Sequence, residues 1–180
     1  KAMVLAGQLG EIRVIQTEFA HGNCATAAEK HSDGAAWRND PKTSGDSFVL
    51  ADVGTHALHL ATFITGQQVL EVSADRQSFV KGRVLEDNAH VLLRFEKGAS
   101  GFLWASGIAV GHRHGLAIRV FGSEGSIEWR QEKPNQLKFS ILGQTTRILE
   151  LDSPELHPPA KRLLRVGAGH PEGYFEAFSN

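Results

Sequence analysis

Cysteine is nearly absent from this chain, since Cys24 is the only one among 180 residues. A single thiol can form no internal disulfide and cannot supply a cysteine-rich zinc site. Positive and negative charges almost cancel, with a formal net charge of -1 at pH 7. No apolar run approaches the roughly 20 residues that span a bilayer, and no signal-peptide pattern is present. We therefore expect a cytoplasmic protein that binds neither nucleic acid nor membrane and whose ligand is a small, near-neutral molecule.

The chain also lacks a dinucleotide-binding fingerprint. Its nearest approach is formed by Gly167, Gly169 and Gly173, whose spacing is G-x-G-x-x-x-G, and no strand-helix-strand unit surrounds them. The sequence opens at Lys1 within a short helical pattern and closes within a second helical pattern that starts at Pro171. We therefore expect further sequence on both sides and no nucleotide site of the usual kind within this chain.

Most of the chain consists of short apolar segments bounded by turn-forming residues, which predicts a sheet. The segments with strand-like patterns are 11–20, 69–74, 89–95, 101–108, 116–121, 125–129, 137–142 and 146–151. Several connections between them are short, so these successive strands must pair antiparallel. Residues 21–47 and 152–169 follow no regular period and are expected to be loops.

One helical pattern, 47–66, interrupts the predicted strands, with Ser47 as a candidate N-cap and Gly66 as a stop. The chain is long enough to bury one core, so we treat residues 1–180 as one domain. The predicted fold class is α+β, a large, mostly antiparallel, open-faced sheet with helices packed on one face. The other face is then free to meet a second copy of the chain.

The predicted helix has two different faces. At about 100° per residue, Asp52, His56 and His59 fall within about 60° of one another on one side. The opposite side is apolar and should pack on the sheet; it contains Leu50, Val53, Ala57, Ala61 and Ile64. The same calculation places Phe48 and Phe63 on the histidine side. A solvated face seldom carries two phenylalanines, so we expect a pocket or another protein surface over it.

A carboxylate one helical turn from an imidazole can hydrogen-bond the ring, fix its tautomer and raise its basicity. Asp52 and His56 have this spacing, and such a pair can take the proton of a hydroxyl group while a hydride leaves for a nicotinamide. On spacing alone, three interpretations stay open: a surface ion pair, a catalytic pair, and a metal site that includes His59. A zinc hydrolase also needs an open coordination position and a general base, which no second motif supplies, so we expect no metal.

Four separated motifs carry a resemblance to a known family. They are Asp52-x-Gly54-x-His56 at the start of the helix, AWRNDP at 36–41, WRQEKPN at 129–135 and GHPEGYFEAF at 169–178. Taken in their order along the chain, these motifs resemble the C-terminal domain of the Gfo/Idh/MocA oxidoreductases, which include glucose-fructose oxidoreductase and inositol dehydrogenase. The resemblance covers essentially the whole chain.

The resemblance implies that this chain is the substrate-binding and oligomerisation domain of a two-domain dehydrogenase. An N-terminal Rossmann domain, absent from this chain, would hold most of the NAD or NADP. The histidine matching His56 is the acid/base, and the carboxylate matching Asp52 supports it. The family's catalytic lysine lies in a Glu-Lys-Pro motif of the first domain, and Glu132-Lys133-Pro134 is not that motif. The chain alone is therefore expected to be inactive.

The implied substrate is a sugar, cyclitol or related polyol, and the implied assembly is a homodimer or a higher homo-oligomer. Four residues are candidates for substrate contact. Trp37 could stack on an apolar sugar face, and Arg38 could bind a hydroxyl or carboxylate group; a packed tryptophan with a solvated arginine is the alternative. His59 stands where the family often has an aspartate, and the resemblance places His170 near the mouth of the site.

A different class of function also remains open. A non-catalytic ligand-binding and oligomerisation domain would keep this fold without turnover. His112 and His114 lie between expected strands and could line a pocket, but residues in a turn need no function.

Overall fold

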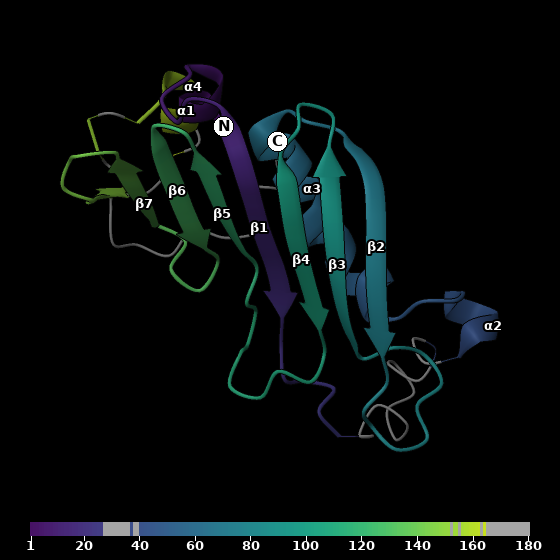
Figure 1. The fold of residues 1–180 in the computed structure, drawn as a ribbon. Helices are drawn as coiled ribbons and strands as arrows, with labels where there is room; N and C mark the ends of the chain where they lie inside the picture. Colours follow the sequence, from purple (N-terminus) through teal and green to yellow (C-terminus); the bar gives the residue numbers. More distant parts are fainter. Residues whose placement is uncertain (27–36, 38–39, 152, 155, 163, 165–180) are drawn as a thin grey trace.

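The computed structural model describes residues 1–26, 37, 40–151, 153–154, 156–162 and 164. Its main feature is an eight-stranded sheet in the order β2-β3-β4-β1-β5-β6-β7-β8 (Figure 1). The strands are β1 (Ile12–Ala20), β2 (Val69–Gln77), β3 (Asn88–Phe95), β4 (Ser100–Ser106), β5 (Ala117–Gly122), β6 (Gly125–Arg130), β7 (Gln136–Ile141) and β8 (Arg147–Glu150). The expected strands are confirmed, with ends that differ by a few residues.

The first strand lies inside the sheet, between β4 and β5. It pairs parallel with β4, where Phe19 is opposite Ala105, and antiparallel with β5, where Ile15 is opposite Val120. All other neighbouring strands of the described sheet are antiparallel, so the predicted fold class is confirmed. Because β1, β2 and β4 run in the same direction, their carboxyl ends meet at one edge of the sheet (Figure 1).

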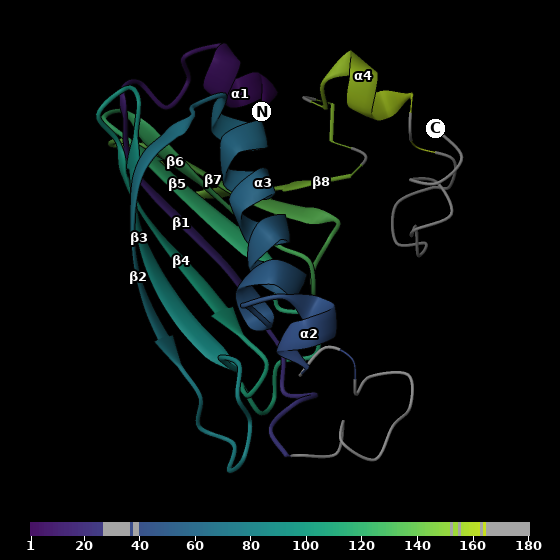
Figure 2. The same ribbon diagram turned by 90° about the vertical axis from the view of Figure 1, so that its right-hand side faces the viewer.

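One face of the sheet is covered by the π-helical turn η3 (Leu50–Gly54) and by α3 (Thr55–Thr65), which pack on β1, β4 and β5. The other described helices, α1 (Ala2–Leu5), α2 (Pro41–Ser44) and α4 (Pro158–Lys161), are each four residues long. Figure 2 shows α3 lying along this face, and the opposite face carries no helix within the described ranges. Thr17 of β1 fixes the contact, since its Oγ1 lies 3.1 Å from the carbonyl oxygen of Ala57 in α3.

The core lies between α3 and the sheet. Ile15 and Leu103 come from the strands, and Val53, Ala57 and Ala61 come from the helical segment. The three helical residues belong to the apolar face predicted from the sequence, and that face is confirmed as the one that packs on the sheet. Ala57 and Ala61 have fully buried side chains, and such small residues let the helix axis approach the strands closely.

Four local predictions are wrong. The segments 21–47 and 152–169 are not irregular throughout, because Pro at the first turn starts α2 and α4 there. Ser47 is not the N-cap of the long helix, which begins with a π turn after Val49. Phe48 does not share the histidine face; its side chain is only 3% exposed. A π turn has i→i+5 hydrogen bonds, so the 100° rotation does not hold across Leu50–Gly54. The helix expected from Pro171 lies outside the described residues.

No helix within the described ranges is long and apolar enough to cross a bilayer.

Candidate active site

The candidate acid/base pair stands where the helical segment crosses the carboxyl end of β1. Asp52 belongs to the π turn, His56 belongs to the first turn of α3, and both are exposed. The imidazole of His56 lies over Phe19, with 5.9 Å between the ring centroids. Phe19 itself is 8% exposed, so its buried ring gives the histidine an apolar contact on the side that faces the sheet.

Gly54, between the two polar residues, explains how the π turn approaches the sheet. Gly54 is buried, and a Cβ atom at this position would lie 3.2 Å from Leu50 Cδ2 and 3.5 Å from Ala105 Cβ in β4. The turn therefore packs closely on β4 at this position. The glycine in the Asp52-x-Gly54-x-His56 pattern lies where the backbone between the two polar residues comes nearest to the sheet.

The start of the helical segment is held by Glu86, which lies just before β3. Its Oε1 accepts hydrogen bonds from the backbone N–H of Phe48 at 3.0 Å and of Leu50 at 3.2 Å, and from Ser47 Oγ at 2.6 Å. Arg76 of β2 pairs with Oε2 at 2.7 Å. Burial by itself would raise the pKa of Glu86, but these hydrogen bonds outweigh it and lower the pKa below its ordinary value. Glu86 therefore serves as the N-terminal cap in place of Ser47.

Two more histidines converge on Phe19 from other segments. His21 follows β1, and its ring centroid is 6.4 Å from that of Phe19. His114 comes from the connection between β4 and β5, at 6.2 Å. Glu132 orders this connection by accepting hydrogen bonds from the backbone N–H of Arg113 and His114. The imidazoles of His21, His56 and His114 therefore surround one aromatic ring at the edge where the strands end.

His21 has the clearest electrostatic signature of the three. Burial lowers its pKa below the ordinary value, Asp52 opposes this shift, and His114 adds to it. His21 Nδ1 also accepts a hydrogen bond from the backbone N–H of Asn23 at 3.3 Å. A neutral imidazole that accepts at Nδ1 carries its proton on Nε2. His21 is thus a neutral donor near Asp52 at physiological pH.

The other predicted residues lie apart from this group or outside the described chain. His59 stacks on Phe63, with 5.9 Å between ring centroids, rather than on Phe19. Trp37 is 50% exposed, and its carbonyl oxygen accepts a hydrogen bond from Thr43 Oγ1 at 2.8 Å. Arg38 and His170 lie outside the described residues. Among the residues that are described, no group of three or more His, Cys, Asp or Glu side chains could hold a metal ion, and this includes Asp52, His56 and His59.

The sequence did not single out His21, and it left open whether His114 lines a pocket or has no function. Both lie in irregular connections, where no period marks a face. One signal was available: polar residues that directly follow strands with the same direction gather at one edge of a sheet. The parallel pairing of β1 with β4 was needed to apply it.

Comparison with known proteins places the chain in a family. Residues 1–128 match the family described as GFO/IDH/MocA C-terminal domain. The chain therefore belongs to the Gfo/Idh/MocA family, as the resemblance of its motifs implied. It is 43% identical to an uncharacterized oxidoreductase, YfiI, of Bacillus subtilis (strain 168), over 100% of this chain and 47% of that protein.

Solved structures agree with the family. An inositol dehydrogenase homolog from Azotobacter vinelandii, complexed with NAD+, superposes with a TM-score of 0.93 and 47% identity, over 99% of this chain and 46% of that one. The same homolog complexed with NADH and myo-inositol gives a TM-score of 0.87 and 46% identity, over 99% of this chain and 45% of that one. The chain thus spans about half the length of these relatives.

Proposed function

We propose that this chain is the substrate-binding half of an NAD(P)-dependent oxidoreductase that acts on a polyol, with His56 as the acid/base and Asp52 as its support. The observation that carries the proposal is the placement of two exposed side chains beside the neutral His21: Asp52 on the glycine-containing π turn and His56 in the first turn of α3. The A. vinelandii homolog that matches 99% of this chain holds NADH and myo-inositol. Myo-inositol is therefore the first substrate to test.

The residues of this chain would perform the proton transfer. His56 accepts the proton of the reacting hydroxyl group through its imidazole, and the carboxylate of Asp52 stabilises the imidazolium that results. The Nε2–H group of His21 donates a hydrogen bond to a hydroxyl oxygen of the substrate and so orients it. Phe19 keeps water from the buried side of the His21, His56 and His114 imidazoles. A bound NAD(P) supplies the acceptor or donor of the hydride.

The cofactor would be held mainly by an N-terminal Rossmann domain that is not part of this chain. The chain has no G-x-G-x-x-G fingerprint to cradle a pyrophosphate, while the exposed side of the helical segment gives a second domain room to approach. We therefore propose that residues 1–180 form one of two domains and have no turnover alone.

The substrate contacts inferred from the sequence belong to the same proposal. His59 is one helical turn beyond His56 on an exposed part of α3, and Trp37 precedes α2. Together with Arg38 and His170 they would contact hydroxyl groups remote from the reacting carbon, which is where members of a dehydrogenase family differ in specificity.

The test uses the full-length protein and the 180-residue chain side by side. The full-length protein, offered myo-inositol and a panel of aldoses with NAD or NADP, should reduce one cofactor in a substrate-dependent manner. The isolated chain should not, and calorimetry should detect no micromolar NAD binding. Full-length protein that binds polyols without reducing either cofactor would favour the non-catalytic ligand-binding domain instead.

A further inference from the structure

An ion pair outside the acid/base group lies in the connection between β2 and β3. Arg83 Nη1 is 2.9 Å from Asp87 Oδ2, and both side chains are 0% exposed. Removing two charges from water costs free energy that their attraction often does not recover. A fully buried pair of this kind therefore adds little to the free energy of unfolding. Its other contacts indicate a second, structural role.

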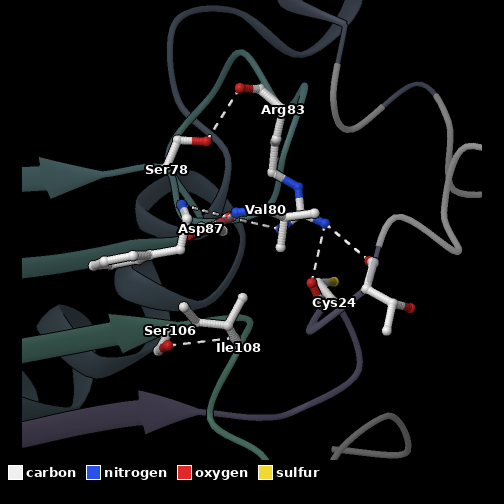
Figure 3. Close-up of polar contacts among 9 residues, drawn as sticks. Cys24, Ser78, Val80, Arg83, Asp87, Ser106 and Ile108 are labelled. Atoms are coloured by element: carbon white, nitrogen blue, oxygen red, sulfur yellow. Dashed lines mark hydrogen bonds and ion pairs between the residues drawn. The ribbon is translucent and has the colours of Figure 1, made fainter.

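Hydrogen bonds of the pair hold the β2–β3 connection together and tie it to the segment after β1, as Figure 3 shows. The carboxylate of Asp87 accepts hydrogen bonds from the backbone N–H of Phe79 at 3.0 Å and of Val80 at 2.9 Å, which closes the β2–β3 connection. The other end of the guanidinium leaves this connection. Arg83 Nη2 donates to the carbonyl oxygens of Cys24 at 3.0 Å and of Thr26 at 3.2 Å.

These two carbonyl groups belong to the segment that carries His21. The backbone of the same segment is tied to β4, since the N–H of His21 donates to Ser106 O and the N–H of Cys24 donates to Gly107 O, both at 2.9 Å. Gly107 N–H in turn donates to the carbonyl oxygen of Asp87 at 2.9 Å. A Cβ atom on Gly107 would lie 3.2 Å from Cys24 Cβ, so the two backbone segments are closely packed here.

Arg83 also reaches the helical side of the site. Its Cζ atom lies 5.7 Å from the centre of the Phe48 ring, which is at the start of the segment that continues into Asp52. One guanidinium therefore contacts both of the segments whose side chains, His21 and Asp52, interact electrostatically. An arginine can do this because its planar fork presents several donors at once.

We propose that Arg83 and Asp87 are a positioning pair that fixes residues 21–26 and thereby places His21 opposite Asp52. The inference rests on the proposed function, since it assigns the pair an effect on polyol binding. Lysine at position 83 would keep the charge beside Asp87, but it could not donate to Asp87 and to both carbonyl groups in the same geometry. Arg83→Lys should therefore loosen residues 21–26 without leaving Asp87 unpaired.

The experiment compares full-length Arg83→Lys with full-length Ile127→Val, a core change in β6 remote from this connection. Arg83→Lys should raise KM for myo-inositol about tenfold and change kcat per folded molecule less than about threefold. Ile127→Val should change neither constant, although it removes buried methyl volume. Hydrogen exchange of the Cys24 amide should accelerate in Arg83→Lys and stay unchanged in Ile127→Val.

A double-mutant cycle with His21→Gln shows whether the effect passes through His21. The two changes should be non-additive, with Arg83→Lys raising KM much less in the His21→Gln background. Full additivity, an unchanged KM in Arg83→Lys, or an unchanged exchange rate at Cys24 would each overturn the positioning role while the proposed function stands. A folded wild-type enzyme that oxidises no polyol would overturn both.

Discussion

Glu86 and Asp87 are adjacent in the sequence, yet their carboxylates hold two different segments of the candidate site. Glu86 Oε1 accepts a hydrogen bond from Phe48 N–H at 3.0 Å, at the start of the helical segment. Asp87 Oδ2 binds Arg83, whose guanidinium holds the Cys24 carbonyl group. The segments that carry His56 and His21 thus share a single support, the residues just before β3.

The role of His56 is tested by His56→Ala in the full-length enzyme. Loss of a general acid or base should lower kcat by roughly 10²- to 10⁴-fold, with a smaller effect on substrate affinity. The side chain is exposed, so the melting temperature should change little. His157→Ala, which alters another exposed histidine, is the matched control. Wild-type turnover in folded His56→Ala would rule out the assignment.

Asp52→Asn tests the support of the imidazole. The amide keeps the shape of the side chain but not its charge, so the imidazolium is less stabilised and kcat should fall. The acidic limb of the pH profile of kcat/KM should move to lower pH. Because both residues serve one proton transfer, the double variant with His56→Ala should be no worse than His56→Ala alone. Independent losses that add would indicate two separate structural effects.

Glu86→Gln should destabilise the domain by about 1 to 3 kcal/mol, the usual cost of weakening buried hydrogen bonds to a charged group. The lowered pKa of Glu86 means that its contribution is complete above the ordinary value of 4.5 and is lost as pH falls through the lower folded value. Urea denaturation at pH 7 and at pH 3 should show a smaller difference between variant and wild type at pH 3. Glu96→Gln, at an exposed carboxylate, should show no such difference.

His21 gives a second pH dependence in a higher range. Its pKa is lowered on folding from the ordinary 6.5, so the unfolded chain binds a proton that the folded chain resists. This contribution is complete above 6.5 and is lost as pH falls through the lower folded value. The His21→Gln variant should not lose this stability. The difference in free energy of unfolding between wild type and His21→Gln should therefore narrow from pH 8 to pH 5. A gap that behaves like that of His157→Gln would contradict the burial of a neutral His21.

The open face of the sheet is the expected site of self-association. It carries apolar residues among charged ones, such as Leu92 of β3, 61% exposed, and Phe121 of β5, 39% exposed. Light scattering should report a homodimer or higher homo-oligomer for the full-length protein, and Leu92→Asp should shift it toward the monomer. Leu142→Asp, at an 80% exposed turn position, should leave the assembly intact. A strict monomer at high concentration would count against this interface.

The sequence by itself determined the strands and the apolar face of the helix, and it singled out Asp52 and His56 as the candidate acid/base pair. Each of these follows from local chemistry: alternation and turn residues for the strands, and a fixed rotation per residue for Val53, Ala57 and Ala61. Prediction failed at Phe48 because the π turn Leu50–Gly54 changes that rotation, and a helical period read from the sequence assumes one rotation throughout. It failed at Ser47 because the cap comes from Glu86, which is remote in sequence.

Only the tertiary structure decided which irregular segments meet Asp52 and His56. His21 and His114 come to Phe19 because β1 inserts between β4 and β5, and no periodicity records a pairing between strands that are far apart in the chain. The same holds for Arg83, whose position in a loop gives no hint that it is buried and bound to Cys24. Local patterns fix what each segment is, whereas long-range pairing fixes which side chains act together.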